Sequence, residues 1–326
     1  MDDVNLYYFP GSYYSLNVIL ALLEKGIPYK GHIVNIHGGD QSHEWFLRLN
    51  PKGEVPVMKV GDTAYSESEH IIDVIDEMFK CGPKLVLEVD TRLGSEVRET
   101  RKLLHDLPID VITFGVLANR KFQTSDNLPQ ALQSRFTRES IDTKFSATIS
   151  EYRKQIQTCS PDVRTSVEGK LAKLEQRRTN ILDDKVVARI LDELEGIFDR
   201  IESILKLNAK GILTGQDDWL FGPEMTAADL ALICLLIRLQ MIGILSRYVN
   251  RTVRPELLRY FNRIDTRASI LKLREIMASV KYVYMRRAIK KYGVMVLKIG
   301  TVVGIGYVCY LGYKALSKME KVLAKN

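Results

Sequence analysis

Ser68 and Glu67 are residues whose type and position suggest chemistry. They stand just before Ile71, Ile72 and Ile75, whose helical spacing predicts that a helix starts near Ser68. A serine hydroxyl and the free amides of a helix N-terminus can bind a carboxylate, and a neighbouring glutamate can hold an ammonium group. The alternative is that both residues only cap the helix.

Other residues that could do chemistry form no recognisable site. His32, His37, His43, His70 and His105 make no His-x-x-x-His pair and have no cysteine partner nearby, so we expect no metal site. The four cysteines are scattered, which favours a reducing compartment over a disulfide framework. No phosphate-binding Walker loop is present, so the sequence does not predict a GTPase that cuts membranes itself.

The elements that must position Ser68 alternate between strand and helix. A predicted strand at residues 6–9 is followed by a helix, and two short strands at 55–60 and 63–65 are joined by the hairpin signal Gly61-Asp62. A second helix follows. This order, βαβ and then ββα, predicts a thioredoxin-like α/β domain.

Two segments resemble motifs of the glutathione transferases. Residues 50–57, Asn-Pro-Lys-Gly-Glu-Val-Pro-Val, resemble the family's Asn-Pro-x-Gly-x-Val-Pro segment, in which the second proline is cis. Residues 65–71 resemble the family's Glu-Ser signature. The resemblance implies a glutathione transferase fold, with a thioredoxin-like domain at residues 1–83 and an all-α domain at residues 90–278.

The same resemblance implies a groove for glutathione. The backbone of Val55, before Pro56, would pair with the extended peptide, as a strand does. Ser68 would bind the γ-glutamyl carboxylate, Glu67 the ammonium group, and Lys52 would approach the glycine carboxylate. The alternative is that Pro56 only shapes a turn.

A transferase also needs a donor that stabilises the glutathione thiolate, and the resemblance implies Ser12, with Tyr13 beside it, after the first strand. The usual Ser-x-Cys or Tyr-x-x arrangement and the usual arginine in the next helix are absent. The sequence therefore leaves transferase activity open. Glutathione is expected as a substrate or ligand, and no cofactor is expected.

Helical patterning dominates the rest of the body. Asp183 or Asp184 can cap a long helix, and Thr226 and Asp229 stand at capping-box spacing before another. Residues 119–184 are an insertion that an ordinary transferase does not have. We consider two interpretations of this insertion, a solvated and partly ordered segment or a surface for a protein partner.

The positive charge of the chain is concentrated at its C-terminal end. The formal net charge is +7, but residues 281–326 hold ten Lys or Arg residues against one acid, so the body is close to neutral. This distribution argues against a nucleic-acid partner and for a membrane surface. We interpret residues 279–292 as a basic amphipathic segment or a solvated spacer, and residues 314–326 as a basic tail.

Residues 293–313 between these basic stretches are mostly apolar. As a helix they would span about 31 Å, close to the thickness of the hydrocarbon layer, with Lys298 near one end. The sequence therefore predicts a C-terminal transmembrane helix that acts as a tail anchor; the alternative is a buried helix of the core.

The transferase-like body, insertion, basic segment and anchor together resemble the ganglioside-induced differentiation-associated protein family, and an invertebrate member of it. This implies a homodimer in the mitochondrial outer membrane, with its body facing the cytosol. It also implies an adaptor or sensor that promotes mitochondrial fission and meets cytosolic protein partners through the insertion. The alternatives are a membrane-bound glutathione transferase that conjugates electrophiles and a metaxin-like import component.

Overall fold

A four-stranded mixed sheet forms the N-terminal part of the computed structural model, which describes residues 3–124, 136–158, 161–210 and 219–280. The strands are β1 (Val4–Tyr8), β2 (Lys30–Ile33), β3 (Val57–Val60) and β4 (Thr63–Ser66). Their order is β2-β1-β3-β4, with β1 parallel to β2 and antiparallel to β3, and β3 antiparallel to β4. The predicted thioredoxin-like topology is confirmed.

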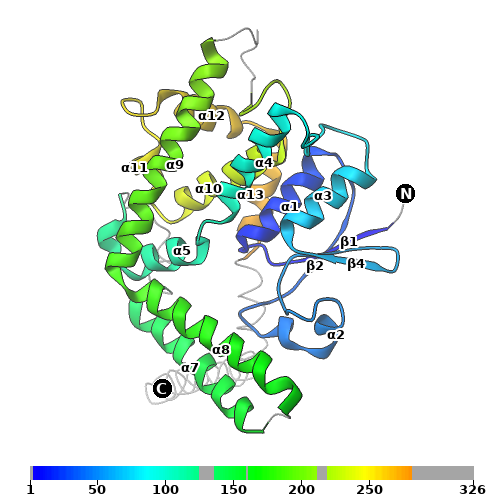
Figure 1. The fold of residues 1–326 in the computed structure, drawn as a ribbon, viewed down its shortest axis with the longest axis vertical. Coiled ribbons are helices and arrows are strands. Elements are labelled where there is room, and N and C mark those ends of the chain that lie inside the picture. Colours follow the sequence, from blue (N-terminus) through cyan, green and yellow to red (C-terminus); the bar gives the residue numbers. More distant parts are fainter. Residues whose placement is uncertain (1–2, 125–135, 159–160, 211–218, 281–326) are drawn as a thin grey trace, which may run out of the picture.

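Helices cover both faces of this sheet. Helices α1 (Tyr13–Glu24) and α3 (Ser68–Met78) lie on one face, and the short α2 (Glu44–Leu47) lies on the other (Figure 1). Phe46 of α2 is fully buried against Val34 and Val57, which makes a small second core below the sheet. The larger core continues from α1 and α3 into the helical part.

The remaining described elements are helices. They are α4 (Arg92–His105), α5 (Ile109–Ala118), α7 (Arg138–Thr158), α8 (Pro161–Leu182), α9 (Asp184–Lys210), α10 (Ala227–Met241), α11 (Leu245–Tyr248), α12 (Pro255–Ile264) and α13 (Ala268–Ala278). Two short 3₁₀ turns, Asp40–Ser42 and Arg120–Phe122, complete the set. The predicted combination of an α/β and an all-α part is therefore confirmed.

Helix α10 is the centre of the helical part, and 13 of its residues are buried. It contacts α1 and α4. Its N-terminus has the predicted capping box, because the Thr226 amide and hydroxyl both donate to Asp229 Oδ2 at 2.8 Å. The long helix predicted to begin at Asp183 or Asp184 is α9, which begins at Asp184.

Helices α7 and α8 fall within residues 119–184. They lie side by side, and α8 also contacts α5 and α9 (Figure 1). The described part of the insertion is thus folded onto the helical body.

No helix among the described residues has the length and apolar character needed to cross a membrane. The predicted anchor at 293–313 and the basic tail lie outside the described residues, as does nearly all of the basic segment at 279–292.

Candidate groove between the two domains

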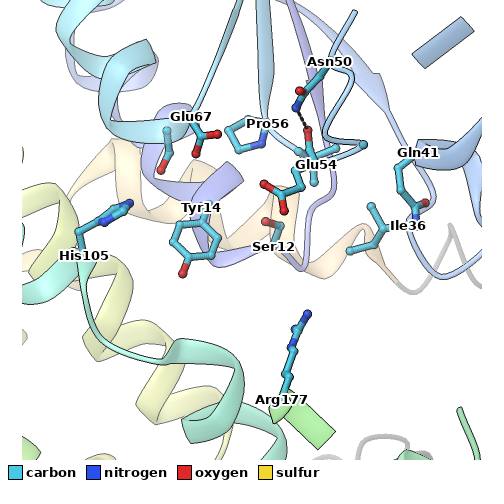
Figure 2. A pocket seen from close by; sticks show the side chains of 13 residues that line it. Ser12, Tyr14, Ile36, Gln41, Asn50, Glu54, Pro56, Glu67, His105 and Arg177 are labelled. Carbon is cyan, nitrogen blue, oxygen red and sulfur yellow. Dashed lines mark hydrogen bonds between the residues drawn. The ribbon is translucent and has the colours of Figure 1, made fainter. Parts of the chain in front are cut away.

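A groove of about 480 Å³ lies between the loops of the sheet and the helical part (Figure 2). Its wall on the sheet side contains Val55, Pro56, Glu67 and Ser68, which are four of the five predicted ligand residues. Ser12, one of the two predicted catalytic residues, also lines it. The other lining residues are Tyr14, Ile36, Gln41, Asn50, Gly53, Glu54, His105 and Arg177.

The segment before Pro56 is fixed by local hydrogen bonds. Asn50 is buried. Its side-chain Nδ2 donates to the Glu54 carbonyl oxygen at 2.8 Å, and its Oδ1 accepts from the backbone amide of Lys52 at 3.1 Å. Gly53 has φ +68°, and a Cβ there would lie 3.0 Å from a backbone oxygen, so a glycine is strongly favoured. The Val55–Pro56 peptide bond is cis, as the resemblance implied.

Ser68 begins α3 and is buried. Glu67 before it has φ +67°, a conformation that non-glycine residues rarely adopt and that costs about 1–3 kcal/mol. Strain of this kind is concentrated at functional sites, where the surrounding structure maintains it. The α3 amides and the Ser68 side chain are thus held at the edge of the groove.

Lys52 does not line the groove. Its Nζ lies 2.6 Å from Glu67 Oε1, and both side chains are more than half exposed. The predicted ligand for the glycine carboxylate therefore pairs with the predicted ligand for the ammonium group. A ligand that uses either residue must compete with this exposed ion pair.

Ser12 caps α1. Its Oγ accepts a hydrogen bond from the Ser15 amide at 3.3 Å. Because that bond uses a lone pair of the oxygen, the hydroxyl proton remains available for a ligand. Arg238 of α10 fixes the loop before α1, because its Nη2 donates to the Gly11 carbonyl oxygen at 2.8 Å. The Ser12 hydroxyl therefore lies at a helix N-terminus, where a thiolate is favoured.

Tyr13 does not line the groove, contrary to the expectation that it would lie beside Ser12 at a bound thiolate. The side chain is buried, and its hydroxyl donates to the Ala231 carbonyl oxygen of α10 at 3.2 Å. Burial raises the pKa of Tyr13 strongly. The helical spacing of Tyr13, Leu16 and Leu20, which share the core face of α1, is the signal that would have shown this.

Tyr14 lines the groove in its place. Burial, and then the carboxylate of Asp110, raise its pKa, while Arg177 lowers it, so the phenol stays protonated at neutral pH and can donate a hydrogen bond. Its ring lies 5.8 Å from the ring of His105. Sequence reasoning missed Tyr14, Glu54, His105 and Arg177. The last two come from α4 and α8, far along the chain.

Among the described residues, no group of three or more His, Cys, Asp or Glu side chains is placed to hold a metal ion. The side chains that line the groove supply hydroxyl, carboxylate, amide, imidazole and guanidinium groups. These groups can bind a polar peptide and stabilise a charge on it.

Comparisons with known proteins agree with this geometry. Residues 6–83 match the family model for the glutathione S-transferase N-terminal domain, and residues 184–263 match that for its C-terminal domain. The β-etherase LigF from Sphingobium shares the fold with a TM-score of 0.58 and 22% sequence identity, over 83% of this chain and 98% of that chain. Glutathione transferase F2 from Populus trichocarpa does so with a TM-score of 0.56 and 19% identity, over 85% of this chain and 99% of that one.

Relatives of similar sequence extend the likeness across both domains. The human ganglioside-induced differentiation-associated protein 1-like 1 is 27% identical to this chain over 277 residues, which cover 83% of this chain and 74% of that protein. The mouse protein of the same name is 27% identical over 280 residues, with the same two shares. Glutathione S-transferase TCHQD from Arabidopsis thaliana is 24% identical over 83% of this chain and 89% of that protein. The chain is a glutathione-transferase-like protein of the ganglioside-induced differentiation-associated protein family.

Proposed function

We propose that the chain is a membrane-tethered sensor whose groove binds glutathione. The observation that carries this proposal is the convergence of Ser12, the Val55–Pro56 segment and the N-terminus of α3 on one groove. An extended peptide can pair with the Val55 backbone, and its γ-glutamyl carboxylate can accept from the Ser68 hydroxyl and the first amides of α3.

Titration calorimetry of the full chain with glutathione tests this binding. Ser68→Ala should weaken binding at least tenfold, because a hydrogen bond to a charged group is worth about 1.5–3 kcal/mol. Ser203→Ala is the matched control, since Ser203 is exposed on α9 and its hydroxyl donates only to the Asp199 carbonyl oxygen. The proposal fails if the wild-type chain binds no glutathione.

We further propose that residues 293–313 anchor the chain in the mitochondrial outer membrane, with the body facing the cytosol. There, as a homodimer, it promotes fission of the mitochondrial network and meets cytosolic partners through the insertion. The apolar run between basic flanks and the membership of the family support this part of the proposal.

Localisation and network shape provide the measurements. A fluorescently labelled full chain should colocalise with mitochondria and resist extraction by alkaline carbonate, whereas a chain ending at residue 292 should be diffuse. Expression of the full chain should fragment the network. If Ser68→Ala removes this effect while the protein stays on mitochondria, the groove regulates it.

A glutathione transferase is the second candidate, and the position of Ser12 favours it. The Ser12 hydroxyl can donate to a bound thiolate from the N-terminus of α1. Ser12→Ala should then lower turnover with an aryl halide at least tenfold while the chain stays folded, since loss of the α1 cap costs only about 1 kcal/mol of stability. Binding of glutathione without turnover would leave the sensor as the function.

A further inference from the structure

One charged side chain of the insertion reaches the groove. Arg177 belongs to α8, more than 100 residues after the last residue of the sheet-side wall, yet it lines the same cavity as Ser12 and Tyr14. In Figure 2 it extends from α8 towards Ser12, opposite the loop that carries Glu54. The insertion is therefore part of the groove as well as an addition to the outer surface.

The guanidinium group is held in place from one side. Its Nε forms an ion pair with Asp110 Oδ2 of α5, and the group lies 5.9 Å from the centre of the Phe145 ring of α7. In the described parts of the chain, Arg177 has no ion pair other than the one with Asp110. Because an arginine carries five N–H donors in a planar fork, an ion pair at Nε leaves donors for a second carboxylate.

The charges of the groove are divided between its two walls. Glu54 and Glu67 lie on the sheet side, and the Lys52 ion pair compensates only Glu67. Arg177 lies on the helical side, with His105. An anionic group is therefore repelled by Glu54 on the sheet side and attracted by Arg177 on the helical side, which would orient a ligand that carries it.

We infer that Arg177 selects ligands in which the group attached to the glutathione sulfur ends in a carboxylate. This inference rests on the proposed function, since the tripeptide must occupy the wall formed by Val55, Pro56 and Ser68. The sulfur substituent then extends towards α8, and its carboxylate accepts hydrogen bonds from the guanidinium fork. The interaction is one of binding, with no covalent step.

A pair of conjugates that differ only in the end group of the substituent tests the inference. S-hexylglutathione and S-(ω-carboxypentyl)glutathione have substituents of equal carbon number, and only the second has a terminal carboxylate. Calorimetry on the full chain in a neutral detergent at low salt should show about a tenfold preference for the carboxylated conjugate. That ratio corresponds to about 1.4 kcal/mol, which is near the lower end for a hydrogen bond between charged groups because the pair is partly exposed and Arg177 is shared with Asp110.

Substitutions of neighbouring arginines separate the local contact from the general charge of α8. Arg177→Met should remove the preference, and Arg177→Lys should retain only part of it, because lysine keeps the charge but loses the fork. Arg178→Met is the matched control: Arg178 pairs with Asp142 of α7 at 2.6 Å, does not line the groove, and its loss should leave the preference intact. Added salt should reduce the preference of the wild type.

The outcomes distinguish the inference from the proposed function. If neither conjugate binds, the inference is overturned, and the proposed function falls with it only if glutathione itself does not bind either. If both conjugates bind the wild type equally, the groove binds glutathione and the role of Arg177 is refuted. The role is also refuted if Arg177→Met weakens both conjugates equally, since Arg177 would then contact the tripeptide, or if Arg178→Met removes the preference too. Melting temperatures identify a variant that has unfolded, and in that case the result with Arg177→Lys decides.

Discussion

Replacement of Asp229 tests how the helical part of the structure is held together. The carboxylate is fully buried and accepts four hydrogen bonds. Oδ1 accepts from the Leu220 amide at 2.8 Å and from the Tyr260 hydroxyl at 2.9 Å, and Oδ2 accepts from the amide and hydroxyl of Thr226, both at 2.8 Å. Asp229 thus joins the start of α10 to α12 and to the segment before α10.

The expected cost of Asp229→Ala follows from these bonds. The hydroxyl of Thr226, the N-cap residue of α10, loses its acceptor Asp229 Oδ2 at a cost of about 1 kcal/mol. The amides of Leu220 and Thr226 and the hydroxyl of Tyr260 each lose a buried partner, at about 1 kcal/mol or more apiece. The sum is about 4 kcal/mol, which for a protein of this size lowers the melting temperature by about 8 °C. Asp229→Asn keeps one acceptor oxygen but turns an amide group towards two donors, so about half of that loss is expected.

Thermal unfolding of the full chain, followed by circular dichroism in one fixed detergent, measures the effect. Asp62→Ala is the matched control, because Asp62 is fully exposed in the β3–β4 turn and its ion pair with Lys59 is long, at 3.8 Å. Its melting temperature should equal that of the wild type. The reasoning is refuted if Asp229→Ala lowers the melting temperature by less than about 2 °C, or if Asp62→Ala lowers it as much.

Two tyrosines give further predictions. Tyr13→Phe should lower stability by about 1 kcal/mol, because the hydrogen bond to Ala231 is lost, and should leave glutathione affinity unchanged. Thermal unfolding and calorimetry measure the two effects. A loss of affinity at unchanged stability would show that Tyr13 contacts the ligand. Burial raises the pKa of Tyr29 to about 12 from 10.0, so between these values the unfolded chain holds fewer protons than the folded one. Stability should therefore fall as pH rises through this window, and more steeply in the wild type than in Tyr29→Phe; equal slopes would contradict the assignment.

Local sequence motifs predicted most of the sheet-side wall. The segment at residues 50–57 encodes its own turn, since Asn50 bonds to the backbone of Lys52 and Glu54 and the positive φ at Gly53 favours glycine. The Glu-Ser signature likewise fixes the start of α3 at Ser68. Such features can be predicted from sequence because all the groups that shape them lie within a few residues of one another along the chain.

The thiol side of the groove was predicted less well. The resemblance implied Ser12 with Tyr13 beside it; Ser12 lines the groove, but Tyr13 is buried and Tyr14 lines the groove instead. Adjacent residues of a helix point about 100° apart, so the face buried against α10 decides which of the two reaches the groove. That face depends on a helix more than 200 residues away along the chain.

The sequence by itself determined the two-domain fold, the turn at Gly53, the capping box of α10 and the start of α9, because short-range hydrogen bonds and hydrophobic periodicity specify each of them. Only the tertiary structure decided that Tyr13 joins the core and that Arg177 faces Ser12 across a groove. These placements arise where distant helices pack, and the packing of α8 against α5 sets the position of Arg177.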